Sequence, residues 1–305
     1  MRVQFKNILC TTDFSDFSNY AVPYGIALAK EFGAKLYLCH IIDLTPAATY
    51  GQAMVDFVEQ QQELTKYANE QLNKLIGEEP IDWELLVSVG HAGDDIIRQA
   101  KEKQVDLVIA ATHGRSGLRR FMLGSVTERM LRTLPCPLMS VRSPEKDITL
   151  PAEKEIVFKK ILVGCDFSDD SNLAFECALS LAQEYQSELH LAHVIEPPVY
   201  KHLLKQAIKT SEELRKGMRD QMNERLAKMI PEETYNWCSH ITTLLAGQPH
   251  EELTKYALVN DIDLIVLGVR GHGLVEKLLV GSTTDRVVRQ ALCPVLSVRP
   301  MVQVG

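Results

Sequence analysis

The second half of this 305-residue chain repeats the first half, and the repetition limits the folds that the chain can adopt. The tetrapeptide Asp-Phe-Ser-Asp stands at positions 13–16 and again at positions 166–169. A proline followed by a short apolar run at 137–142 returns at 294–299 with conservative exchanges. Each half has the length of one ordinary domain, so the sequence predicts an internal duplication.

Both halves alternate short apolar runs with longer helical patterns. In the first half the predicted strands cover 7–12, 35–42, 83–89, 107–110 and 137–142. Strands separated by helices require right-handed crossovers, which produce an open parallel sheet. Pro23 lies inside the first helical pattern, so that helix either starts late or bends there.

A charged segment with two prolines and no sustained period separates the halves. Such a composition is typical of a linker. We therefore predict a first domain at 1–143, a linker at 144–158 and a second domain at 159–305.

A glycine-rich loop follows the apolar run at 264–267. Gly268 and Gly271 open this loop, and Gly281 closes it after nine more residues, directly before Ser282. Ser282 with an acid three residues on is the pattern of a helix N-terminal cap. Glycines let backbone N–H groups close on an anion, and a helix N-terminus adds partial positive charge. The loop predicts a phosphate cradle, although a single glycine pair would be explained better as two unrelated turns.

The first half has the same loop, and its repetition favours the cradle. Gly114 is followed after nine residues by Gly124 and Ser125, and Ser125 with Glu128 forms a second capping pattern. One position differs, because Ala111 stands where the second half has glycine. A methyl group penalises a positive φ and prevents close approach of a ligand to the backbone. We therefore expect binding in the second half, and binding at equal or lower affinity in the first.

Three features of each half are expected to converge. In an open parallel sheet, ligands bind beyond the carboxyl ends of the strands, where the strand order reverses. The aspartate after the first strand (Asp13, Asp166), the end of the second strand (Ile41, Val194) and the glycine loop meet there. Their convergence is the main argument for a ligand site.

The composition argues against several classes of protein. A net charge of −7, without a basic excess in either half, does not support nucleic-acid binding. The cluster Arg115, Arg119 and Arg120 is the exception, either as a solvated loop face or as a contact to phosphates. No apolar run is long enough to span a bilayer, and the N-terminus has no signal-peptide core, so we expect a cytoplasmic protein.

No metal site is expected from the histidines or cysteines. His190 and His193 are three residues apart on a predicted strand, so they point to opposite faces. The seven cysteines include no Cys-x-x-Cys pair, and reduced thiols in apolar segments behave as small hydrophobes.

The repeated glycine loop, with its following serine and the preceding aspartate, resembles the universal stress protein family in its tandem, two-domain form. The resemblance covers nearly all of the chain except the linker and the tail. It implies a Rossmann-like, open parallel five-stranded sheet with helices on both faces in each half. It also implies ATP as the ligand of nucleotide-binding members, with Mg²⁺ or Mn²⁺ as candidate metals. The two domains would pair through their last strands, and a further homodimer stays open.

By position, the resemblance assigns a nucleotide-binding set to each half. The aspartate would approach the ribose or a metal-bound phosphate, the end of the second strand would contact adenine, and the glycine loop would hold the phosphates. The second-half set is Asp166, Val194, Leu267, Gly268, Arg270, Gly271, Gly281, Ser282 and Thr283. The first-half set is Asp13, Ile41, Ala110, Ala111, His113, Gly114, Gly124, Ser125 and Val126.

We expect an ATP-binding stress-response regulator or nucleotide-sensing module, and not an enzyme. Gly-Ser, and not Gly-Lys-Ser, opens each helix, so the lysine of a P-loop is missing. The sequence has no Ser-His-Asp elbow or dinucleotide fingerprint, and no evident base that would position water for rapid ATP hydrolysis. Two alternatives stay open: an interaction module that does not use nucleotide, and a slow ATPase or nucleotidyl-transfer enzyme.

Overall fold

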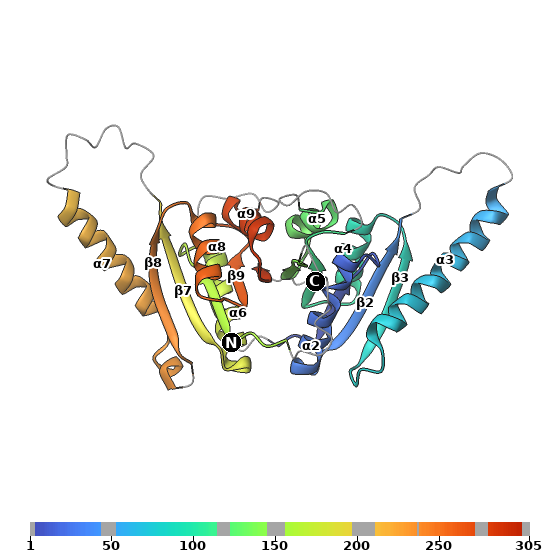
Figure 1. The fold of residues 1–305 in the computed structure, drawn as a ribbon, viewed down its shortest axis with the longest axis horizontal. Coiled ribbons are helices and arrows are strands. Elements are labelled where there is room, and N and C mark those ends of the chain that lie inside the picture. The colour runs from blue at the N-terminus through green and yellow to red at the C-terminus, as the bar shows by residue number, and fades with distance from the viewer. Residues whose placement is uncertain are drawn as a thin grey trace. The chain divides into compact units, whose positions relative to one another are not determined.

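Strands and helices alternate along the chain and group into two units, drawn in Figure 1. The N-terminal unit comprises Gln4–Ile156, and the C-terminal unit comprises Val157–Arg299. In this computed structural model, the residues described are 4–43, 53–114, 123–144, 156–196, 211–236, 238–271 and 280–300.

The same order of elements occurs in both units. The N-terminal unit contains β1 (Asn7–Thr11), α1 (Asp16–Asn19), α2 (Val22–Phe32), β2 (Lys35–Ile42), α3 (Ala53–Ile76), β3 (Trp83–Val89), α4 (Ala92–Glu102), β4 (Leu107–Ala111), α5 (Ser125–Thr133) and β5 (Leu138–Val141). The C-terminal unit contains β6 (Lys160–Gly164), α6 (Asp169–Tyr185), β7 (Glu188–Ile195), α7 (Ser211–Met229), the 3₁₀ helix η2 (Glu232–Asn236), β8 (His240–Ala246), α8 (Pro249–Val259), β9 (Leu264–Gly268), α9 (Ser282–Gln290) and β10 (Val295–Val298).

The described strands of each unit form a five-stranded parallel sheet. Its order is β3-β2-β1-β4-β5 in the N-terminal unit and β8-β7-β6-β9-β10 in the C-terminal unit. Successive crossovers first move outward from β1 and β6 and then move the opposite way, so right-handed connections place helices on both faces. The predicted α/β fold is therefore confirmed. The strand order reverses between β1 and β4, and between β6 and β9, and we call each of these places the reversal point.

The inner strands are buried, which explains their continuous apolar sequences. Every residue of β4 is buried, and in β9 only the terminal Gly268 is partly exposed. The edge strands β3 and β8 keep most of their side chains partly exposed. Because burial of each Leu or Ile contributes about 1.5–3 kcal/mol, the inner strands hold the loops at their carboxyl ends on a rigid base.

The first crossover differs between the units. Helix α1 ends at Asn19, and α2 begins at Val22 with Pro23 in its first turn. Proline lacks the N–H that a helix interior needs, but it is tolerated at a helix start. Of the two alternatives predicted for Pro23, a late start or a bend, the structure shows the late start. In the C-terminal unit, α6 runs unbroken for 17 residues.

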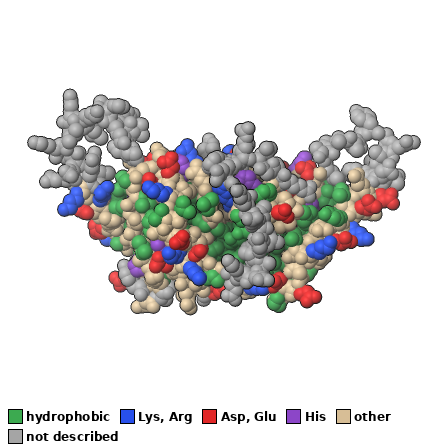
Figure 2. All heavy atoms as spheres, viewed as in Figure 1, with side chains coloured by type: hydrophobic (Ala, Val, Ile, Leu, Met, Phe, Trp, Pro, Cys, Tyr) green, Lys and Arg blue, Asp and Glu red, His purple; other side chains and the backbone are tan. Residues whose placement is uncertain are grey.

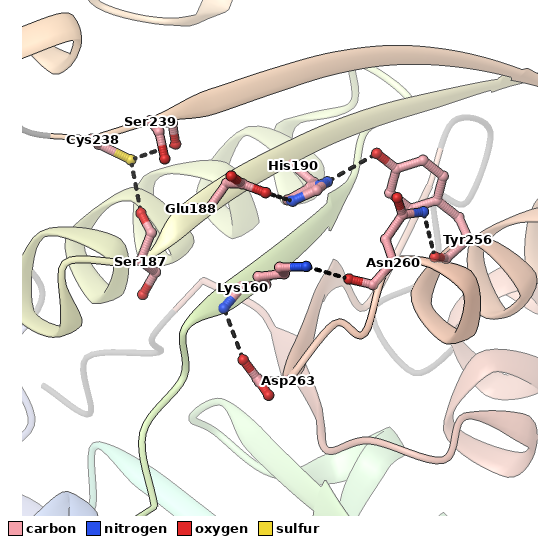
Figure 3. A network of polar contacts seen from close by, with 9 residues as sticks. All are labelled: Lys160, Ser187, Glu188, His190, Cys238, Ser239, Tyr256, Asn260 and Asp263. Carbon is pink, nitrogen blue, oxygen red and sulfur yellow. Dashed lines mark hydrogen bonds and ion pairs between the residues drawn. The ribbon is translucent and has the colours of Figure 1, made fainter.

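In both units an aspartate before the fourth strand holds the start of the first strand, at the end of the sheet away from the reversal point. The backbone N–H of Lys160 donates to Asp263 Oδ2 at 2.9 Å, and Lys160 Nζ donates to the carbonyl oxygen of Asn260 at 2.9 Å (Figure 3). The backbone N–H of Asn7 donates to Asp106 Oδ2 at 2.9 Å in the same way. These bonds tie the first strand of each unit to its fourth strand.

The surface carries charges of both signs. On the face drawn in Figure 2, acidic and basic side chains are interspersed over the described part of each unit. Across the described helices, none is both long enough and apolar enough to cross a membrane.

Candidate functional site

Two loops leave neighbouring strands at each reversal point. Asp13 follows β1 and Gly114 follows β4, and these two strands pair directly. Asp166 follows β6 and Gly271 follows β9, which also pair. The acid and the glycine loop therefore lie together in each unit, at the edge where open parallel sheets bind ligands.

The acidic side chain is held by the turn that follows the first strand. Asp13 Oδ1 accepts hydrogen bonds from the backbone N–H of Ser15 at 3.0 Å and from the hydroxyls of Ser15 and Ser18 at 2.6 Å each. Asp166 Oδ1 accepts from the backbone N–H of Ser168 at 3.0 Å and from its hydroxyl at 2.5 Å. These bonds fix the carboxylate in one orientation.

A residue with an unfavourable backbone conformation follows the acid in both units. Phe14 has a φ of 66° and Phe167 a φ of 63°, in the left-handed region that bulky residues avoid. Each ring packs on a histidine from the second strand, His40 at 4.1 Å and His193 at 4.8 Å between ring centroids. Such a conformation persists where the surrounding contacts determine it, and it is often found at functional sites.

Glycine allows the loop to lie directly against the carboxylate. A β-carbon at Gly271 would stand 2.5 Å from Oδ2 of Asp166, and one at Gly114 would overlap Oδ2 of Asp13. Real β-carbons do not approach other atoms so closely. A side chain at either position would therefore force the loop or the carboxylate to move, and glycine lets the two lie together.

Two hydrogen bonds close the far end of the glycine loop in both units. The N–H of Gly124 donates to the carbonyl oxygen of Thr112 at 2.9 Å, and the hydroxyl of Thr127 donates to the last carbonyl of β4 at 2.8 Å. Gly281 and Thr284 make the same bonds in the C-terminal unit at 2.8 Å and 2.7 Å. The loop ends and the following helix are thereby fixed to the strand.

The predicted capping roles of Ser125 and Ser282 are wrong. Helix α5 begins at Ser125 with Gly124 as its N-cap, and α9 begins at Ser282 with Gly281 as its N-cap. The closing hydrogen bond of each glycine places that glycine at the cap position, so the serine moves into the first turn. Glycine has no side chain that could cover the first N–H groups, and uncovered N–H groups at a helix start suit an anion.

A cavity of about 220 Å³ lies at the reversal point of the N-terminal unit. All nine residues predicted for this half line it: Asp13, Ile41, Ala110, Ala111, His113, Gly114, Gly124, Ser125 and Val126. Sequence reasoning missed the other lining residues: Thr11, Thr12, Ser18, Cys39, Ala92, Ile96, Thr127 and Met130. Ile96 and Met130 carry only the helical periodicity of core residues, so no signal in the sequence separates them from the rest of the core.

The C-terminal set also gathers at its reversal point, but Gly268 packs against protein. A β-carbon there would stand 2.6 Å from the carbonyl carbon of Asp170 and 2.8 Å from the N atom of Ser171. Gly268 thus admits the start of α6. The expected φ penalty at Ala111 does not apply, because Ala111 and Gly268 both end β-strands and neither has a positive φ.

The remaining members of the C-terminal set lie on the flanking elements. Leu267 is buried in β9, and a β-carbon at Gly164 of the neighbouring strand would meet its Cδ2 atom. Val194 lies near the end of β7, and Ser282 and Thr283 form the start of α9. The arginine cluster 115, 119 and 120 lies outside the described residues.

Arg270 is bound by a carboxylate that the sequence did not single out. Its Nε and Nη2 atoms donate to Asp170 Oδ2 and Oδ1 at 2.9 Å each, and its backbone N–H donates to Asp170 Oδ2 at 3.1 Å. The hydrogen bonds to Asp170 raise the pKa of Arg270. The two residues are 100 positions apart in the sequence. The acidic pair Asp169–Asp170 after the α6 cap was the sequence feature that could have pointed to this contact.

The two histidines of β7 have separate partners. His190 Nδ1 lies 2.9 Å from the hydroxyl of Tyr256, and its Nε2 lies 2.6 Å from Glu188 Oε1 (Figure 3). His193 Nδ1 lies 2.7 Å from the carbonyl oxygen of Cys165. Within the described ranges, no group of three or more His, Cys, Asp or Glu side chains is arranged to hold a metal ion.

The seven cysteines are free thiols. Six are buried and Cys293 is half-buried. Burial raises the pKa of Cys39 and of Cys177 to about 12. These thiols therefore stay protonated and pack as small hydrophobes, as predicted.

Comparison with known proteins decides the family. The model of the universal stress protein family matches residues 4–142 and matches again at 158–299. The chain belongs to the universal stress protein family. The double match confirms the tandem form.

Individual proteins with similar sequences support the same family assignment. A universal stress protein of Methanocaldococcus jannaschii is 31% identical over 147 residues, which cover 47% of this chain and 85% of the relative. One of Thermus aquaticus is 34% identical over 151 residues, which cover 47% of this chain and all of the relative. The crystal structure of a universal stress protein from Archaeoglobus fulgidus matches 97% of both chains with a TM-score of 0.67 and 20% identity, which shows the shared fold.

Proposed function

We propose that this universal stress protein binds ATP at the reversal points and acts as a nucleotide-sensing module in a stress response. The observation that supports this most is the glycine that lies against an aspartate carboxylate, Gly114 with Asp13 and Gly271 with Asp166. A bare glycine loop, a carboxylate and a helix N-terminus suit a phosphate group and its metal together.

The residues of the N-terminal unit fit the parts of the nucleotide. The backbone of Ser125 and Val126 offers N–H groups at the start of α5 to the phosphates. Asp13 offers the oxygen ligand that Mg²⁺ or Mn²⁺ prefers. Ile41, near the end of β2, gives the adenine an apolar contact in the same cavity.

The proposed module works by binding rather than by turnover. ATP that binds only the folded state stabilises the protein by mass action, by about 2.7 kcal/mol at one hundred times Kd. Nucleotide bound at the starts of α5 and α9 would change the surface of the protein there, and a partner could read the nucleotide state from that surface.

Nucleotide that co-purifies with the full chain tests the proposal. The protein is denatured after purification and the released small molecules are identified by mass spectrometry, and we expect ATP. Gly114→Val and Gly271→Val each place a side chain into one cradle and should each reduce the bound ATP. Gly217→Val is the matched control, because Gly217 lies in α7 with no atom within 4 Å of a β-carbon.

Other outcomes would support the alternatives. A folded chain that never captures adenine nucleotide would favour an interaction module. ADP that accumulates over days, and ceases to do so in Asp13→Ala and Asp166→Ala, would favour a slow ATPase.

A further inference from the structure

The two reversal points differ at three corresponding positions. Alignment of the repeated Asp-Phe-Ser-Asp segments places Phe17 opposite Asp170. The glycine loops place Ala111 opposite Gly268, and His113 opposite Arg270. In the C-terminal unit Asp170 hydrogen-bonds Arg270 and its backbone lies against Gly268, so the three differences belong to one set of contacts.

Asp170 occupies the donors that a phosphate would use. Its carboxylate accepts from Nε and Nη2 of Arg270 at 2.9 Å each, and from the backbone N–H of Arg270 at 3.1 Å. A planar guanidinium fork and a loop amide directed at one oxyanion are the arrangement that a phosphate site requires. The side chain of Asp170 is only 6% exposed, so this carboxylate is an internal anion and not a surface ion-pair partner.

Gly268 makes this contact possible. The carbonyl carbon and oxygen of Asp170 would lie 2.6 Å and 2.8 Å from a β-carbon at position 268. The start of α6 therefore rests on the last residue of β9, which brings Asp170 within reach of Arg270. In the N-terminal unit the corresponding residues are Ala111, which carries a methyl group, and the uncharged Phe17, which aligns with Asp170.

Displacement of Asp170 by a ligand would be costly. A phosphate that takes Arg270 leaves the buried carboxylate of Asp170 without its cation, close to the loop that also contacts Asp166. An uncompensated buried charge strongly opposes such an exchange. In the N-terminal unit the residue aligned with Asp170 is Phe17, which has no carboxylate to offer at this position.

We propose that Asp170 is a built-in competitor for the phosphates at the C-terminal reversal point, so that the C-terminal unit binds ATP more weakly than the N-terminal unit. This inference rests on the proposed function. It reverses the order of affinity expected from the complete glycine pattern, because Gly268 serves the contact of α6 and not the approach of a ligand.

Isothermal titration with Mg-ATP on the full chain tests the inference. Gly114→Val blocks the N-terminal cradle and leaves the C-terminal site to be measured alone. On this background, Asp170→Asn should tighten ATP binding by about tenfold or more. Asp169→Asn is the matched control, because it removes the same charge from the same helix turn. Asp169 is exposed, so this substitution should change the affinity by less than about twofold.

The outcomes separate this inference from the proposed function. An unchanged or weaker ATP affinity in Asp170→Asn overturns the competitor role, and so does an equal gain in affinity in Asp169→Asn. The proposed function survives either result if Gly271→Val shows that the N-terminal unit binds ATP. No binding in the wild type, in either single-cradle variant or in Asp170→Asn overturns both. Thermal unfolding checks that each variant is folded, and Asp170→Ser replaces Asp170→Asn if the amide prevents folding.

Discussion

Gly271 lies so close to the carboxylate of Asp166 that a β-carbon at this glycine would stand 2.5 Å from Oδ2. The same relationship joins Gly114 to Asp13 in the other unit. Glycine at these positions thus serves the protein's own acid, in addition to any ligand. The acid and the loop form one surface at the carboxyl ends of two paired strands, and this surface is the basis of the proposed nucleotide site.

The exchange of Gly and Ala at one corresponding position should have very different costs in the two units. Gly268→Ala forces a methyl group against the backbone of Asp170 and Ser171, and we expect a loss of about 1–3 kcal/mol in unfolding free energy. Ala111→Gly removes a methyl group from a strand and should cost about 0.5–1 kcal/mol. Urea unfolding of the full chain measures both. Equal costs would show that α6 does not rest on Gly268 as described.

Asp13 should contribute to stability even without nucleotide. Asp13→Ala removes the acceptor of three hydrogen bonds from Ser15 and Ser18, so we expect a loss of about 1–3 kcal/mol. The exposed Asp16 on the next turn is the control, and Asp16→Ala should stay within about 0.5 kcal/mol of the wild type. Denaturant unfolding without ATP measures the unfolding free energy of both variants. Equal stability of Asp13→Ala and Asp16→Ala would contradict this role.

His250 should make stability depend on pH. It is buried at the start of α8, and burial first, then the charge of Arg286, lower its pKa, while Glu251 acts in the opposite direction. The unfolded chain therefore binds a proton near pH 6.5 that the folded chain does not bind. Its contribution is complete above about pH 6.5 and is lost as the pH falls toward the lower, folded pKa. Thermal unfolding from pH 7.5 to 5 should show a smaller decrease in Tm for His250→Gln than for the wild type, and an identical decrease would exclude His250 as the cause.

The buried thiols should resist alkylation. Burial raises the pKa of Cys177 to about 12 and raises that of Cys10 as well, so the reactive thiolate is scarce in the folded chain. At pH 8, iodoacetamide should modify these two residues at least about tenfold more slowly in the native chain than in urea. Mass spectrometry of tryptic peptides gives both rates. Equal rates in the two states would mean that these residues are accessible in solution.

The sequence was sufficient for the fold because its signals are local. Continuous apolar runs such as Leu264–Gly268 mark inner strands, and Pro23 marks a helix start, whatever the rest of the chain does. Strands separated by helices then require a parallel sheet with right-handed crossovers. The strand ends that carry the candidate site residues were predictable for the same reason.

The details of the site depend on contacts between distant residues, and the sequence alone did not reveal them. Asp170 meets Arg270 across 100 residues, and only the approach of α6 to Gly268 makes that contact possible. The capping prediction at Ser125 failed because a hydrogen bond from Gly124 to Thr112, the residue after β4, shifts the helix start by one residue. Both are effects of tertiary packing on a local pattern.

Titration of the full chain with Mg-ATP, in parallel with the double variant Gly114→Val Gly271→Val, tests the central claim most directly. We expect saturable binding by the wild type, and its loss in a double variant that still unfolds cooperatively. Gly217→Val, the control outside both cradles, should bind as the wild type does. Wild-type protein that gives no saturable heat, or a double variant that binds ATP as tightly as the wild type, would contradict the assignment of the reversal points as nucleotide sites.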